Sequence, residues 1–142
     1  MPPMPPRMPP PDTVIQKCNR KIENDENDFV IGIANTRGHN YFGWPDPNGG
    51  TDGVGFRDPN GQDGDLPQSE AGSKARSCRP CYKSNSPLKY GKGAGKPGTS
   101  ASNDDIKDCL KNRPIKGNYH GLKNNCNDWA RGAEKDCGLF CP

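Results

Sequence analysis

The apolar residues of this chain fall in a few short runs separated by long polar stretches. Residues 29–33 form a continuous apolar run bounded by turn residues, which predicts a strand. Residues 39–44 predict a second strand, in which alternate side chains face opposite sides. A turn rich in proline and glycine at 45–50 leads to a short strand at 54–56, so these last two strands are expected to form a hairpin.

Two short helices and one long irregular stretch are also expected. Residues 13–22 predict a short helix, and residues 104–111 predict another, with Ser102 or Asn103 as its cap, acids in its first turn and lysines in its last. Residues 57–103 read mostly as loop, with Cys78 and Cys81 as the natural pins. Residues 118–122 predict a further short strand.

The last predicted element is a helix of about twelve residues that begins at Cys126. Asn125 is a good N-cap, and Asp128 three residues later resembles a capping box. Apolar residues then recur at helical spacing on one face: Cys126, Trp129, Ala130, Ala133 and Cys137. Gly138 is a natural stop. Cys126 therefore sits in the first turn, where unpaired amides and the helix dipole lower the pKa of a thiol.

Composition indicates a small core that needs covalent support. Only 29% of the 142 residues are hydrophobic, and the mean hydropathy is -1.06. Six of the seven cysteines are expected to form three disulfides: Cys18, Cys78, Cys81, Cys109, Cys137 and Cys141. Cys126 is then the odd thiol. The alternative is a four-thiolate zinc site built from the Cys78/Cys81 and Cys137/Cys141 pairs, and otherwise no metal or cofactor is expected.

A thiol nucleophile needs a base, and the chain has two histidines. His39 opens a strand after a glycine and is the preferred base. His120 lies six residues before Cys126 and is the alternative. Nothing in the spacing selects the group that orients the histidine, so the candidates remain open. They are Asp46, Asp52, Asp58 and Tyr41.

Charge and low-complexity segments bear on the partners. Residues 1–70 hold six basic and eleven acidic residues, whereas residues 71–142 hold fourteen basic and six acidic ones. No helical stripe or aromatic interleaving suggests nucleic-acid binding. No run is long enough to span a membrane, and no signal peptide is visible. Residues 1–12 form a proline-rich arm that could dock to a secretion carrier, and residues 13–142 are expected to be a single domain.

Several of these residues resemble one family. The segment 38–43 (Gly-His-Asn-Tyr-Phe-Gly), followed by Gly55-Phe56 and much later by residues 119–130, resembles the circularly permuted papain-like hydrolases of the NlpC and lecithin:retinol acyltransferase type. Similar modules occur in type VI secretion and polymorphic toxin effectors. The resemblance implies that Cys126 is the nucleophile and His39 the base, on an α+β fold with a small antiparallel sheet.

The expected function is therefore that of a cysteine hydrolase. The expected setting is an antibacterial effector that cleaves a peptidoglycan amide bond in the periplasm of a target cell and has a cognate immunity protein. Two alternatives stay open. One is a phospholipase or acyltransferase with the same Cys–His mechanism, and the other is a non-enzymatic binding module stapled by disulfides or zinc.

Overall fold

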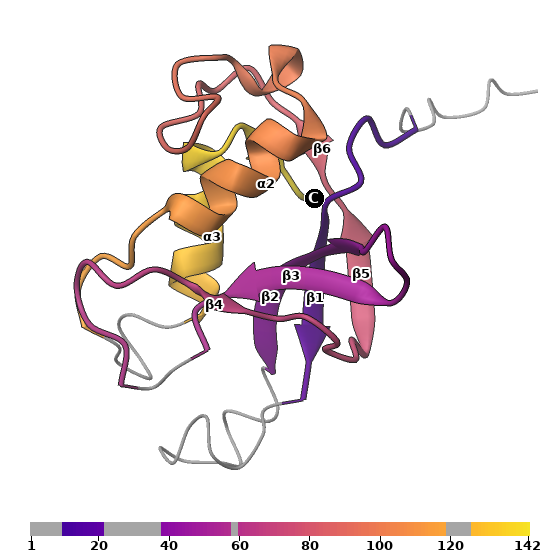
Figure 1. Cartoon of the computed structure of the whole chain (residues 1–142), viewed down its shortest axis with the longest axis vertical. Coiled ribbons are helices and arrows are strands. Elements are labelled where there is room, and N and C mark those ends of the chain that lie inside the picture. Colours follow the sequence, from indigo (N-terminus) through magenta and orange to yellow (C-terminus); the bar gives the residue numbers. More distant parts are fainter. Residues whose placement is uncertain (1–9, 22–37, 58–59, 119–125) are drawn as a thin grey trace, which may run out of the picture.

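The computed structural model describes residues 10–21, 38–57, 60–118 and 126–142 of the chain, and its fold is α+β (Figure 1). A five-stranded antiparallel sheet has the order β4-β3-β2-β1-β5. Its strands are β1 (Gln16–Arg20), β2 (His39–Pro45), β3 (Thr51–Gly55), β4 (Gln68–Ser69) and β5 (Ser77–Pro80). The other elements are a two-stranded sheet of β6 (Tyr82–Lys83) and β7 (Leu139–Phe140), the 3-10 helix η1 (Gly98–Ser100), and the helices α2 (Asn103–Asn112) and α3 (Cys126–Asp136).

The expected hairpin is confirmed. Strands β2 and β3 pair antiparallel, with Phe42 opposite Val54 and Gly43 opposite Gly53. The connecting turn is closed by a hydrogen bond from the Gly49 amide to the Asp46 carbonyl (3.0 Å). The predicted alternation along β2 therefore divides the sheet into one face with Phe42 and another with His39 and Tyr41.

The predicted helix at 13–22 is wrong, because residues 16–20 of this segment form strand β1. It pairs with β2 on one side and with β5 on the other, so that Cys18 lies opposite both Tyr41 and Cys78. A segment of five mostly polar residues has little helical preference of its own, and its pairing with a strand on each side decides its conformation. The strand predicted at 29–33 and residues 119–122 of the strand predicted at 118–122 lie outside the described residues.

Both later helices are confirmed. Helix α2 is closed by a capping box, in which Ser102 accepts from the Asp105 amide and the Asp105 carboxylate accepts from the Ser102 amide. Helix α3 starts at Cys126, and Gly138 stops it with a φ of 66°. None of the described helices is long and apolar enough to cross a membrane.

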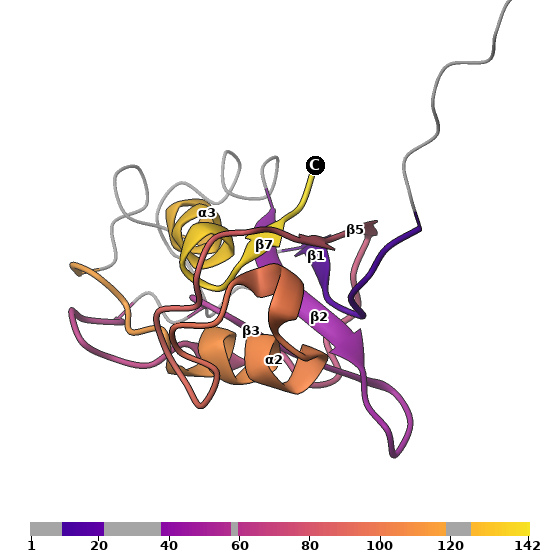
Figure 2. The same ribbon diagram turned by 90° about the horizontal axis from the view of Figure 1, so that it is seen from above.

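The two helices lie beside the sheet (Figures 1 and 2). Their contacts with Phe42 and Trp44 show that they cover the face that carries these two side chains. On α3, Trp129 meets Phe42 edge to face at 5.9 Å between ring centroids. On α2, the ammonium groups of Lys107 and Lys111 lie 5.7 and 5.6 Å from the centre of the Trp44 ring. The apolar core between helices and sheet is small, as the composition predicts.

Three disulfides supplement this core, and they use the six cysteines expected to be paired. Cys18 bonds to Cys78, Cys81 to Cys141 and Cys109 to Cys137. Cys78 and Cys81 thus have different partners, which excludes the four-thiolate zinc site. The stretch 57–103, expected to be mostly loop, is pinned at both cysteines and also contributes β4, β5 and β6 to the sheets.

The Cys109–Cys137 disulfide joins α2 to the residue that follows α3, and we expect it to contribute substantially to the free energy of unfolding. It closes a loop of 28 residues. The double variant Cys109→Ala/Cys137→Ala should therefore lose about 3–4 kcal/mol of unfolding free energy, by the entropy of loop closure. Urea denaturation followed by circular dichroism would measure the change. An unaltered midpoint would mean that packing alone holds α2 in place.

Candidate active site

Cys126 is the one cysteine outside the disulfides, and it is the first residue of α3. Its side chain is buried, with 6% of its surface exposed. The backbone amides of Asn127 and Asn40 both donate hydrogen bonds to its sulfur. Donors of this kind stabilise a thiolate over a thiol. The start of the helix therefore supplies the electrostatic setting that the sequence predicts.

His39 is the first residue of β2 and is 5% exposed. Its ring forms hydrogen bonds with the Cys126 side chain and with the Glu70 carboxylate. The bond to Glu70 Oε2 uses Nε2, which leaves Nδ1 as the nitrogen for Cys126. The structure thus brings together the cysteine and the histidine that sequence analysis selected.

Glu70 is the group that orients His39, and its side chain is completely buried. One carboxylate oxygen binds His39. The other accepts from Arg20 Nε (3.0 Å) and from the Ser73 hydroxyl (2.7 Å). The Glu70 amide donates to the Gly53 carbonyl (2.9 Å), so the backbone is anchored to β3 as well. These contacts fix the position of the carboxylate.

The three groups shift one another's pKa values. Burial alone would lower the pKa of His39, but the hydrogen bonds to Cys126 and Glu70 outweigh it and raise the pKa to about 9. Burial would raise the pKa of Cys126, yet the bonds from His39 and the two amides lower it. Burial would raise the pKa of Glu70 as well, but the contacts with His39 and Arg20 lower it to about 2. The arrangement favours a thiolate–imidazolium pair beside a carboxylate.

Glycines on β3 make the room for Glu70. A β-carbon at Gly55 would lie 2.9 Å from Tyr41 Cβ, 3.1 Å from Glu70 Oε2 and 3.2 Å from His39 Nε2. A β-carbon at Gly53 would lie 2.4 Å from the Phe42 carbonyl oxygen. Glycine at these positions lets the histidine–carboxylate pair lie directly against the sheet.

A row of amide side chains extends from the site across β2 and β1. Asn40 donates through Nδ2 to the Asn127 Oδ1, and accepts at Oδ1 from Asn19 Nδ2 (2.8 Å). Arg76 Nε in turn donates to Asn19 Oδ1 (2.5 Å). The row fixes Asn40, whose own backbone amide touches the Cys126 sulfur.

The other predicted orienting residues have different positions. Asp46 lies in the turn at the far end of β2, where its carboxylate accepts from the Asn48 amide (2.9 Å). Asp52 lies opposite Trp44, also at that end, and its carboxylate is 3.9 Å from Lys111 Nζ. Tyr41 does neighbour His39, with the two rings stacked at 5.9 Å.

Two further candidates, Asp58 and the alternative base His120, lie outside the described residues. So does the predicted cap Asn125. Sequence analysis missed Glu70 because it lies 31 residues from His39, beyond a turn-rich stretch. The usable signal was the Gly53-Val54-Gly55 pattern, because glycines inside a strand indicate that another group approaches closely.

Comparison of the chain with protein-family models, with curated proteins and with solved structures finds no match. The candidate site therefore rests on its own geometry.

Adding a methyl group at Gly55 should displace the histidine–carboxylate pair. Gly55→Ala is expected to lower the pKa of His39, because the bond to Glu70 that helps to raise it is weakened. Gly43→Ala is the matched control, since it lies on the same sheet face and its β-carbon would meet no atom closer than 3.4 Å. NMR titration of the His39 ring would measure both. Equal pKa values in the two variants would contradict the close contact.

Glu70 should make stability depend on pH on the acidic side. Its pKa falls from 4.5 to about 2 on folding, so its contribution is complete above pH 4.5 and disappears as the pH falls through about 2. The shift corresponds to about 3 kcal/mol. The difference in unfolding free energy between wild type and Glu70→Gln should shrink by about this amount between pH 5 and pH 2. Taking the difference cancels the contributions of the carboxylates that both proteins share. A difference in unfolding free energy that stays constant with pH would refute the lowered pKa of Glu70.

Proposed function

We propose that the protein is a cysteine hydrolase in which Cys126 is the nucleophile, His39 the acid–base group and Glu70 the orienting carboxylate. The observation that carries the proposal is the bonded series Cys126–His39–Glu70, in which the single unpaired cysteine is the one beside a histidine. A nucleophile, a base and a group that holds the base are the parts that thiol acyl transfer needs.

The reaction would proceed by acyl transfer to sulfur. The thiolate adds to the carbonyl carbon of an amide, and amides at the start of α3 stabilise the oxyanion. The His39 imidazolium then gives its proton to the leaving amine as the C–N bond breaks, which leaves a thioester on Cys126. Water, deprotonated by His39, adds to the thioester and releases the acid together with the thiolate. Glu70 keeps the ring oriented through both halves.

The proposed architecture is that of a permuted papain-like hydrolase. Its support is the chain order, in which the histidine strand precedes the nucleophile helix, and the packing of α3 on β2 through Trp129 and Phe42. The proposed substrate is a peptidoglycan amide, cleaved by an antibacterial effector in the periplasm of a target cell. The three disulfides suit such an oxidising compartment.

The nucleophile should react with iodoacetamide well below the pH at which ordinary thiols do. Without reduction, peptide mapping should find label on Cys126 alone. In His39→Gln, the main contact that offsets burial is lost and the pKa of Cys126 rises. The labelling rate at pH 6 should therefore fall by tenfold or more. Rates that are equal in the two proteins would mean that His39 does not activate the thiol.

Hydrolysis can be followed on purified peptidoglycan, with mass spectrometry of the soluble fragments. The rate should fall as the pH rises through about 9, because His39 then lacks the proton for the leaving amine. Cys126→Ala and His39→Ala should both abolish activity, whereas His120→Ala should retain it. Fatty acid release from phospholipid vesicles, with intact peptidoglycan, would redirect the proposal to the lipid esterase alternative.

A further inference from the structure

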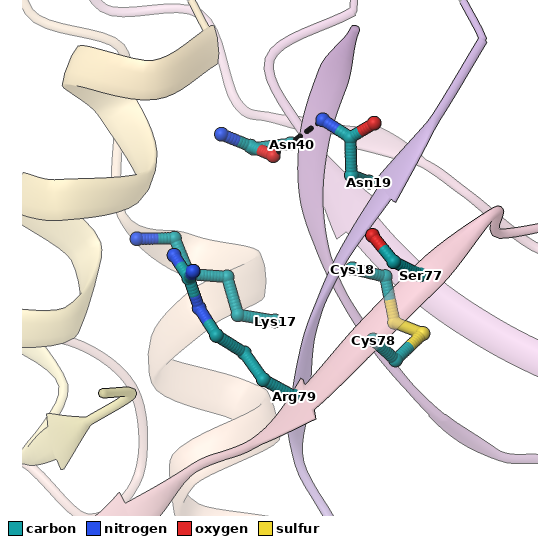
Figure 3. A pocket seen from close by; sticks show the side chains of 7 residues that line it. All are labelled: Lys17, Cys18, Asn19, Asn40, Ser77, Cys78 and Arg79. Atoms are coloured by element: carbon teal, nitrogen blue, oxygen red, sulfur yellow. Dashed lines mark hydrogen bonds between the residues drawn. A yellow bond between two sulfur atoms is a disulfide. The ribbon is translucent and has the colours of Figure 1, made fainter. Parts of the chain in front are cut away.

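A pocket with a volume of about 420 Å³ adjoins the candidate site (Figure 3). Its lining comes from three neighbouring strands: Lys17, Cys18 and Asn19 on β1, Asn40 on β2, and Ser77, Cys78 and Arg79 on β5. Asn40 belongs to both the pocket and the site, since its amide touches the Cys126 sulfur and its side chain binds Asn127. Asn40 therefore connects the pocket with the surroundings of the Cys126 sulfur.

The strand register places the cations of the pocket side by side. Lys17 is opposite Arg79, and Asn19 is opposite Asn40, so all four side chains share one face of the sheet. Figure 3 shows Lys17 and Arg79 extending from their strands toward helix α3. The disulfide partners Cys18 and Cys78 alternate to the other face, where they tie the edge strand β5 to β1.

The two cations differ in how far they are neutralised. Lys17 is buried, and its ammonium group lies 2.6 Å from the Glu134 carboxylate. Arg79 is exposed, and within the part of the chain that the structure describes it has no ion pair. No acidic residue lines the pocket. The pocket therefore carries the uncompensated positive charge of one guanidinium group, whose planar fork matches the two oxygens of a carboxylate.

We propose that this pocket is a substrate subsite in which Arg79 binds a carboxylate, so that the enzyme prefers amide substrates with an acidic group next to the scissile bond. The inference rests on the proposed function, because the pocket is a subsite only if Cys126, which is linked to it through Asn40, is the nucleophile. A cell-wall or other peptide with a free carboxylate has this chemistry. A phosphate group, as in a lipid head group, is the other anion that a guanidinium group binds through paired hydrogen bonds.

The test uses a pair of alkylating probes, the α-amides of N-iodoacetyl-glutamate and N-iodoacetyl-glutamine, of which the first carries one carboxylate and the second carries no charge. Both form a bond from the Cys126 sulfur to the probe's methylene carbon, with loss of iodide, so no turnover is needed. The measured quantity is the ratio of the labelling rate with the acidic probe to that with the neutral probe. This ratio should be about tenfold higher in the wild-type protein than in Arg79→Gln. Arg79→Lys, which keeps the charge without the fork, should give an intermediate ratio.

Lys92→Gln is the matched control for long-range electrostatics, because Lys92 is exposed and does not line the pocket. It should leave the ratio at the wild-type value. A ratio that is the same in wild type and Arg79→Gln overturns the subsite and leaves the hydrolase proposal standing. No reaction with either probe overturns the hydrolase proposal and the subsite with it. Stronger protection by glycerophosphate than by N-acetyl-glutamate, dependent on Arg79, would overturn the carboxylate in favour of phosphate.

Discussion

Four ionisable groups of alternating sign follow one another through the interior: the Arg20 guanidinium, the Glu70 carboxylate, the His39 ring and the Cys126 sulfur. Each is at most 6% exposed. Removing an isolated charge from water costs several kcal/mol, so each group is tolerated only because its neighbours compensate it. The series joins β1, the segment after β4, β2 and α3, and it constrains their relative positions. The charge states of the candidate site and the architecture therefore depend on the same contacts.

The rest of the fold supports this series with few apolar residues. The helices α2 and α3 cover one face of the sheet through Phe42 and Trp44, while the charged series reaches α3 from the other face at the start of β2. The disulfides distribute covalent support around it. Cys18–Cys78 holds the edge strand, Cys109–Cys137 joins the helices, and Cys81–Cys141 anchors the chain end. A core of this size needs such links to keep the site rigid.

The parts of the structure that sequence analysis anticipated are those with strong local signals. The capping residues and apolar spacing of α2 and α3 determine both helices, and turn residues determine the β2–β3 hairpin. Strand β1 escaped because its conformation depends on pairing with strands 20 and 60 residues away, which no local pattern records. Glu70 escaped for the same reason. Cys126 and His39 were found through residue type and position, but their partner was set by the tertiary fold.

The burial of Cys126 protects the three disulfides from thiol–disulfide exchange. A thiolate is the species that attacks disulfide sulfurs, and here it shares a small domain with three of them. In the folded chain the sulfur is buried and hydrogen-bonded to His39, Asn40 and Asn127. Unfolding removes these contacts and permits thiol–disulfide exchange. The native pairing is thus preserved by the fold itself, and recovery after denaturation depends on keeping this one sulfur protonated or blocked.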